Sequence, residues 1–281
     1  MPDGLAPTVL TPAVADARCD PGLPPAGPRT GRPHPVAALV DRIGDLFVPL
    51  GFDLVQLPLL ESVRDNFDVL GYPPDHPTRT RLSLLPAPDV VLRTHATSGG
   101  PRAMRAAAPG PLRALLVGTC FRNELSSPYS GSQFTQIDGL VVQPDVGLPE
   151  LMGLFDRLVS GLFGPGHPWR VRRGGYPFAA PGFAVEVACP RCGPGCDECE
   201  GRGHVEIGAG GLLRAQVLTA GGYDPHRVTG LSFGCSVERL LRLSHGLTDI
   251  RELLVNDMRL LEQFEHAYLP VGPSEKGVDR P

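Results

Sequence analysis

The sequence lacks an excess of basic residues. It has 281 residues, with 26 Lys and Arg against 30 Asp and Glu, so its formal net charge is −4. Proteins whose main task is to hold nucleic acid usually carry a basic surplus. The charge balance therefore argues against tight, independent binding of nucleic acid, although a local basic patch is compatible with it.

A long apolar run is also lacking. No stretch approaches the roughly 20 apolar residues that a membrane-spanning helix needs. The N-terminus does not have the charged and then apolar layout of a secretory signal. We therefore predict a cytoplasmic protein with no membrane partner. In that compartment the seven cysteines are expected as thiols or metal ligands, not as disulfides.

Glycine and proline, by contrast, are abundant, with 35 and 32 residues. Residues 1–34 are rich in both and have little apolar periodicity, so we predict a disordered leader there. Residues 269–281 are expected to be a second flexible tail. The intervening segment, 35–268, is the expected catalytic domain, and hydrophobic residues make up 42% of the chain, enough for a substantial core.

The pattern within this domain favours an α+β fold with an antiparallel sheet flanked by helices. Apolar residues recur at helical spacing over 35–50 and 148–163. Further helices are predicted near 61–70, 97–108, 212–221 and 236–245 and from about 256, and residues 72–88 are expected as a loop. The predicted strands are joined mainly by hairpins and loops, without regular βαβ crossovers, which argues against a doubly wound fold.

Two arginines lie in segments suited to phosphate. Arg122 stands at the mouth of a polar loop between two predicted strands, and Phe134 lies on the return strand. Glu238 and Arg239 begin a helix that follows a strand of small residues. Two fork-shaped, permanently charged donors and an exposed aromatic ring suit a bent nucleotide triphosphate. Taken singly, each arginine is equally compatible with a surface salt bridge or a solvated helix start.

A cysteine cluster occupies residues 189–204. Its two Cys-x2-Cys pairs are typical of zinc sites, in which four soft ligands form a tetrahedron. The predicted ligands are Cys189, Cys192, Cys196 and Cys199, with His204 in reserve. Four protein ligands leave no open position, so this zinc-knuckle insertion would be structural; the alternative is a loop of reduced thiols. The remaining cysteines, Cys19, Cys120 and Cys235, are expected as isolated thiols.

Several motifs occur in an order that resembles the catalytic core of the phenylalanyl-tRNA synthetase alpha chain, a class II aminoacyl-tRNA synthetase. The resemblance covers about four-fifths of the chain, from His34 to Phe264. FRNE through FTQIDG (121–139) resembles motif 2, and FGCSVERL (233–240) resembles motif 3. The other matching segments are NFDVL (66–70), HPTR (76–79), RTHATS (93–98) and YPF (176–178).

The resemblance implies a role for each of these residues. Arg122 would hold the α-phosphate of ATP and Arg239 the γ-phosphate, with Phe134 stacked on adenine. Glu124 would contact adenine or Mg²⁺, and Glu238 would belong to the same ATP site. The residues implied for the amino acid are His95, Thr97, Gln136, Asp138, Tyr176, Phe178 and Ser232.

Departures from the family pattern concern the amino-acid end of the site more than the ATP end. Both arginines are kept, whereas other family residues are replaced by Ser130, Thr135, Asp138, Ala180, Arg214, Ala215, Ser232 and Ser236. We therefore expect a truncated, stand-alone paralogue that activates an aromatic or other apolar amino acid and tolerates a smaller or more polar substrate than phenylalanine.

The acceptor stays open between tRNA, a carrier protein and a small molecule. The resemblance also implies a homodimer that pairs through the first helix and strand. An alternative of another class is a catalytically silent synthetase paralogue that binds nucleotide or amino acid in a regulatory or interaction role.

Overall fold

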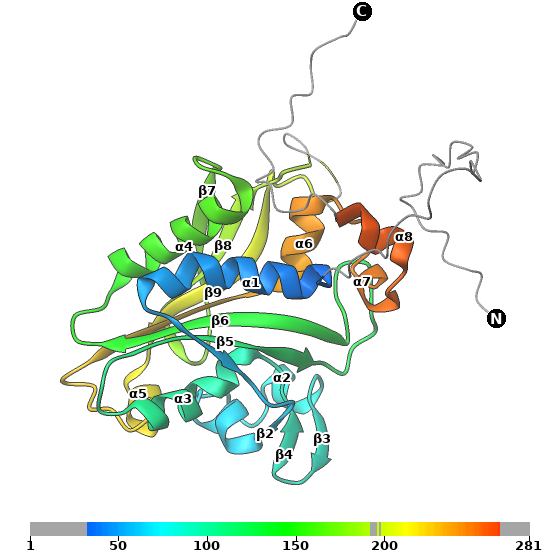
Figure 1. Cartoon of the computed structure of the whole chain (residues 1–281). Coiled ribbons are helices and arrows are strands. Elements are labelled where there is room, and N and C mark those ends of the chain that lie inside the picture. The colour runs from blue at the N-terminus through cyan, green and yellow to red at the C-terminus, as the bar shows by residue number, and fades with distance from the viewer. Residues whose placement is uncertain (1–32, 192–195, 197, 265–281) are drawn as a thin grey trace, which may run out of the picture.

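A seven-stranded sheet forms the centre of the molecule in the computed structural model, which describes residues 33–191, 196 and 198–264 (Figure 1). Its spatial order is β1-β5-β6-β10-β9-β8-β7. The strands are β1 (Asp53–Gln56), β5 (Leu112–Phe121), β6 (Gln133–Gln143), β7 (Trp169–Gly174), β8 (Ala179–Ala188), β9 (His204–Leu213) and β10 (Thr229–Ser236).

All neighbours in this sheet pair in antiparallel fashion except β1 and β5, which are parallel. A parallel pair needs a crossover of a dozen residues or more, and residues 57–111 supply it. The predicted α+β architecture is confirmed, with this one parallel pair as a correction. The local hairpin pattern could not show it, because the crossover contains other strands and helices.

Three helices cover one face of the sheet: α1 (Pro35–Phe47), α4 (Leu148–Phe163) and α6 (Val237–His245) (Figure 1). Their apolar stripes and the facing sheet residues form the larger hydrophobic cluster. Phe47, Phe52 and Phe233 meet there with ring centroids 5.3–6.3 Å apart. Burial of aromatic rings of this size supplies much of the driving force that holds helices on a sheet.

The opposite face carries shorter elements and a second hydrophobic cluster. A small sheet of order β2-β4-β3 lies on this side (Figure 1). Its strands are β2 (Leu60–Ser62), β3 (Leu84–Ala87) and β4 (Val90–Leu92). The helices are η2 (Arg64–Asp68), α2 (Pro77–Thr80), η3 (Ala96–Gly99), α3 (Gly100–Ala107) and α5 (Ala215–Ala220).

Several boundaries differ from those predicted. The helix expected over 61–70 is a five-residue π-helix, and the loop expected over 72–88 contains α2 and β3. The helix expected over 212–221 is only α5, because β9 reaches Leu213. β9 was not predicted, because its glycines interrupt the apolar alternation by which a strand is recognised.

The C-terminal part of the described chain consists of short helices beside α1 and α6 (Figure 1). They are α7 (Glu252–Val255), α8 (Met258–Leu261) and η4 (Glu262–Phe264), and one further turn, η1 (Val48–Leu50), follows α1. Among the described residues, no helix is both long and apolar enough to cross a bilayer. The predicted leader, apart from its last two residues, and the predicted tail lie outside the described residues.

Candidate active site

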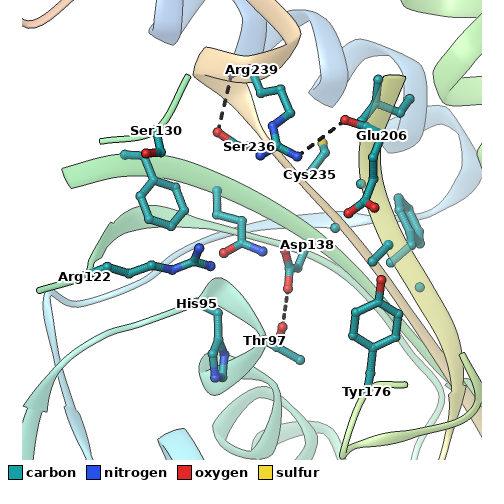
Figure 2. A pocket seen from close by; sticks show the side chains of 18 of the residues that line it. His95, Thr97, Arg122, Ser130, Asp138, Tyr176, Glu206, Cys235, Ser236 and Arg239 are labelled. Carbon is teal, nitrogen blue, oxygen red and sulfur yellow. Dashed lines mark hydrogen bonds between the residues drawn. The ribbon is translucent and has the colours of Figure 1, made fainter. Parts of the chain in front are cut away.

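A cavity of about 310 Å³ opens on the sheet face opposite α1 and α4. Strands β6, β9 and β10 form its floor. The loop after β5, the segment around η3 and the turn before β8 form its sides. Figure 2 shows side chains from these separate segments converging on one space. The volume and the mixture of apolar walls with a few polar groups are typical of a small-molecule site.

Strand alternation explains why the floor is polar. On β6, Ile137 packs into the larger core, whereas Gln136 and Asp138 on either side of it line the cavity. On β10, Phe233 enters the core and Ser232 lines the cavity. Because successive side chains of a strand point to opposite faces, these polar residues are directed into one pocket by the same register that buries their neighbours.

Arg122 and Arg239 line the same cavity although they are far apart in sequence (Figure 2). Arg122 extends from the loop after β5, and its guanidinium carbon lies 4.7 Å from the centroid of the Phe134 ring. Arg239 lies in the first turn of α6, where its Nη1 donates to the backbone oxygen of Glu206 over 3.4 Å. Ser236 caps that helix and accepts from the Arg239 amide. The cavity thus has two guanidinium groups on two different elements.

Two of the residues predicted for ATP are placed differently from expectation. Phe134 is buried, with only 8% of its surface exposed, because Arg122 covers its ring. Glu238 does not belong to the cavity lining. Its buried carboxylate accepts from the backbone amide of Thr135 over 2.7 Å and so ties α6 to β6. Glu124 lines the cavity as predicted.

Asp138 is the buried carboxylate of the site. Its Oδ2 accepts from the hydroxyl of Thr97 over 2.5 Å, and its Oδ1 has no partner among the described residues. Burial raises the pKa of Asp138 to about 7, against the opposing effect of hydrogen bonds from Thr97 and Gln136. A carboxylate that lines a cavity and keeps one buried oxygen unpaired suits a cationic donor.

His95 also lines the cavity, stacked on Tyr72 with ring centroids 5.3 Å apart and planes at 17°. Burial, aided by Arg122 and Arg93, lowers the pKa of His95 to about 3. The ring is therefore neutral at physiological pH. Both ring nitrogens are buried, and Figure 2 shows the ring directed away from Arg122 and Asp138.

The remaining wall is formed by aromatic and very small residues. Tyr176 and Phe178 lie with ring centroids 6.0 Å apart on one side, and Gly210 and Ser232 lie on the strands opposite. A Cβ added to Gly210 would come within 2.7 Å of the Ser232 backbone oxygen. Close packing of β9 against β10 therefore requires glycine at this position of the floor.

A family model described as tRNA synthetases class II core domain (F) matches residues 18–264. The chain belongs to this family. The phenylalanine–tRNA ligase alpha subunit of an Exiguobacterium species is 36% identical over 244 residues, which cover 86% of this chain and 72% of that protein. The alpha subunit of Symbiobacterium thermophilum is 35% identical, and the match covers 92% of this chain and 77% of that protein. The alpha subunit of Lysinibacillus sphaericus is 33% identical, and the match covers 90% of this chain and 74% of that protein.

Family membership confirms the resemblance read from the motifs and the class II synthetase fold. Within this synthetase domain, the cavity lining contains eleven of the twelve predicted substrate residues: Arg122, Glu124, Phe134, Arg239, His95, Thr97, Gln136, Asp138, Tyr176, Phe178 and Ser232. Sequence analysis assigned no role to Tyr72 or Glu206, which line it as well; an aromatic beside a proline-rich loop and a carboxylate on an unrecognised strand gave no signal.

The cysteine cluster lies at the end of the β8–β9 hairpin. The Sγ atoms of Cys189, Cys196 and Cys199 all lie within 4.8 Å of one another, and two of the pairs are separated by 3.6 and 3.8 Å. In a tetrahedron of thiolates 2.3 Å from zinc, neighbouring sulfurs are about 3.8 Å apart. The donor set therefore fits zinc. Cys192 lies outside the described residues. His204 begins β9, and its Nδ1 is buried without a partner among the described residues.

Proposed function

We propose that this chain activates an amino acid with ATP and transfers the resulting acyl group to an acceptor. The observation that carries the proposal is the convergence of Arg122 and Arg239 on one cavity that is also lined by Asp138, a buried carboxyl with one unpaired oxygen. Cationic forks suit a triphosphate, and a buried carboxylate suits an ammonium group. An ATP molecule and an amino acid present these two charges.

In the proposed reaction, a carboxylate oxygen of the amino acid attacks the α-phosphorus of ATP. The bond from that phosphorus to the bridging oxygen breaks, and pyrophosphate leaves. Arg122 would stabilise charge at the α-phosphate, Arg239 would hold the γ-phosphate, and Mg²⁺ would neutralise the phosphates. Glu124 is the candidate on the Arg122 loop for contact with adenine or Mg²⁺. The Phe134 ring would receive adenine once Arg122 turns from it toward phosphate.

Asp138 would receive the ammonium group of the amino acid, together with Gln136. Gln136 Oε1 already accepts from the Ala96 amide over 3.2 Å and from the Cys120 thiol over 3.6 Å, so the ammonium group would share this oxygen. Thr97 would orient Asp138 through their hydrogen bond, and His95 would support the substrate as a neutral donor or acceptor. Glu238 we now assign to holding α6 and β6 together, not to contact with ATP.

The names of the relatives point to phenylalanine as a substrate and tRNA as an acceptor. Tyr176 and Phe178 would form the wall for an aromatic or other apolar side chain. The hydroxyl of Ser232 supports tolerance of a smaller or more polar side chain than phenylalanine. Among acceptors we favour tRNA, because the similar proteins are named tRNA ligases. The net charge of −4 does not favour tight binding of nucleic acid, so it agrees better with a carrier protein or a small molecule.

The test is exchange of labelled pyrophosphate into ATP with a panel of amino acids. We expect exchange with at least one aromatic or apolar amino acid. Substitution of Arg122 or Arg239 by Ala should lower kcat/KM by about 10²–10³-fold, the usual loss when one transition-state donor is removed. Arg227→Ala, an exposed position outside the cavity lining, is the control. Exchange with no amino acid would favour a silent paralogue that only binds nucleotide or amino acid.

We further propose that the cysteine cluster holds a structural Zn²⁺ through Cys189, Cys196 and Cys199 with Cys192, and His204 in reserve. The distances between the three described sulfurs support a closed thiolate site. When bound, zinc would hold the hairpin end in one conformation and take no part in the reaction.

A homodimer is the quaternary structure that we propose. Five exposed apolar residues lie on consecutive segments from the end of α1 to β2: Val48, Leu50, Leu54, Leu59 and Leu60. β1 is also an edge strand of the large sheet. An apolar patch beside an open edge supports association with a second chain.

A further inference from the structure

Arg242 on α6 connects three parts of the molecule that are separate in sequence. Its side chain is 5% exposed and pairs with Glu198, whose side chain is 4% exposed. Glu198 stands between Cys196 and Cys199 of the cysteine cluster. The Arg242 guanidinium carbon also lies 4.1 Å from the centroid of the Tyr129 ring. One buried cation thus contacts both the cysteine cluster and the loop between β5 and β6.

That loop, residues 122–132, forms one side of the cavity. Tyr129, Ser130 and Gly131 line the cavity together with Arg122 and Glu124. Two contacts fasten the loop tip to the body of the domain. The first is the ring of Tyr129 on Arg242, and the second is a hydrogen bond of 3.1 Å from the Ile250 amide to the Pro128 oxygen. Among the described residues, Arg242 is therefore the cation of the one cation–π contact at this loop tip.

Arg239, which lines the cavity, lies one helical turn before Arg242 on the same helix. Residues three apart on a helix share a face. A displacement of Arg242 would consequently move both the loop tip and the helix turn that carries Arg239.

We propose that Arg242 is a positioning residue for the triphosphate end of the cavity, held in place by Glu198. This proposal rests on the proposed function for its kinetic consequence, but its structural part does not. An arginine left without its buried partner pays a large desolvation cost, so loss of Glu198 shifts Arg242 away from Tyr129. The loop tip then loses the contact between Tyr129 and Arg242. The loop 122–132 becomes less ordered, and ATP binds more weakly.

The kinetic test uses the full chain and measures pyrophosphate exchange with four variants. Tyr129→Ala and Arg242→Met should raise KM for ATP by about fivefold to thirtyfold, the range that one partly desolvated cation–π contact supports. Glu198→Gln should act in the same direction. KM for the amino acid should change far less. Tyr129→Phe keeps the ring on Arg242 and should raise KM for ATP less than Tyr129→Ala does.

The matched control is Glu200→Gln. Glu200 lies in the same cysteine segment, but its ion pair with Arg202 is exposed, with side chains 76% and 58% accessible. It should leave both KM values unchanged. Equal rises in KM for ATP and for the amino acid in Tyr129→Ala would overturn the positioning role, because a general loss of structure affects both substrates.

A second readout needs no activity. Hydrogen exchange of the loop amides (122–132) in the ligand-free protein should quicken in Tyr129→Ala, Arg242→Met and Glu198→Gln, and stay unchanged in Tyr129→Phe and Glu200→Gln. If Arg242→Met fails to fold, Tyr129→Ala, at a 52% exposed residue, still decides the outcome. Unchanged loop exchange in Tyr129→Ala would sink the proposal. Absence of pyrophosphate exchange in the unaltered chain would count against the proposed function. It would not affect the hydrogen-exchange test of Arg242 as a positioning residue.

Discussion

Burial shifts the ionisation of single residues in the cavity. Asp138 is 2% exposed and its pKa is raised to about 7 by burial. His95 is 6% exposed and its pKa is lowered to about 3. Both shifts favour the neutral form, as burial dictates. An arriving ammonium group would restore the charge on Asp138, so substrate recognition and the burial of this carboxyl are linked.

Asp138→Asn tests this link through pH. Because kcat/KM reports ionisation of the free enzyme, we expect kcat/KM for the amino acid to rise with pH up to about 7 and then level off. The variant should lose that step and show a kcat/KM lower by about 10- to 100-fold, the value of one hydrogen bond to a charged group. Equal pH profiles in both proteins would contradict a role for Asp138 in binding the ammonium group.

The same substitution has an opposite effect on stability. The carboxyl has a higher pKa folded than unfolded, so its ionisation opposes folding, and this cost grows as pH rises from about 4 to about 7. Above pH 7, Asp138→Asn should therefore increase the free energy of unfolding by about 1–3 kcal/mol. Denaturant titration at pH 5 and pH 8 measures the difference.

At the scale of elements, side-chain contacts join the end of the β8–β9 hairpin to α6. The β8–β9 hairpin ends in the cysteine cluster, and the buried pair of Glu198 with Arg242 joins this end to α6. Arg191 adds a second link, with Nη2 donating to the Gly246 oxygen at the end of α6 over 2.7 Å. A metal in the cluster would thus stabilise the contact between hairpin and helix as well as the loop itself.

Removal of that metal should lower the thermal stability of the whole domain. We expect about one equivalent of zinc in the purified chain, and a Tm lower by roughly 5–10 °C after chelation under reducing conditions or in Cys199→Ser, which corresponds to ~2–3 kcal/mol for a domain of this size. Cys120→Ala is the control, because this buried thiol lies outside the cluster. Less than about half an equivalent of zinc in the unaltered chain would refute a structural site.

At the scale of the whole molecule, one face of the sheet packs against helices and the other face carries the cavity. One face is sealed by α1, α4 and α6 over the larger core. The other face carries the cavity, with shorter elements around it. The edge at β1 is left with exposed leucines on both sides of Pro58. A monomer that exposes so many large apolar side chains on neighbouring segments is expected to cover them.

Light scattering should therefore return twice the chain mass of 29.9 kDa. Leu54→Glu and Leu60→Glu, at residues 50% and 48% exposed, should shift the mass toward the monomer because they place charge on the proposed contact. Val255→Glu is a matched control, since this residue is 71% exposed but lies at the C-terminal end. A monomer at tens of micromolar concentration in the unaltered chain would disprove a homodimer.

The sequence by itself determined the fold class, the family and eleven of the residues that line the cavity. Motif 2 runs from the end of β5 through one loop into β6, and motif 3 runs from β10 into the start of α6. Within each strand or helix, local periodicity fixes which side chains share a face. It also indicated the cysteine cluster through spacing alone.

Only the tertiary structure decided which charged groups meet. The resemblance implied that Glu238 belongs to the ATP site, yet its carboxylate accepts from the Thr135 amide on β6, a strand about a hundred residues away. Phe134 was expected to be exposed, yet Arg122 covers it. The strand β9 and the Glu198–Arg242–Tyr129 contacts gave no local signal. Long-range pairing depends on how helices and strands pack, and packing is a property of the folded chain that no short stretch of residues encodes.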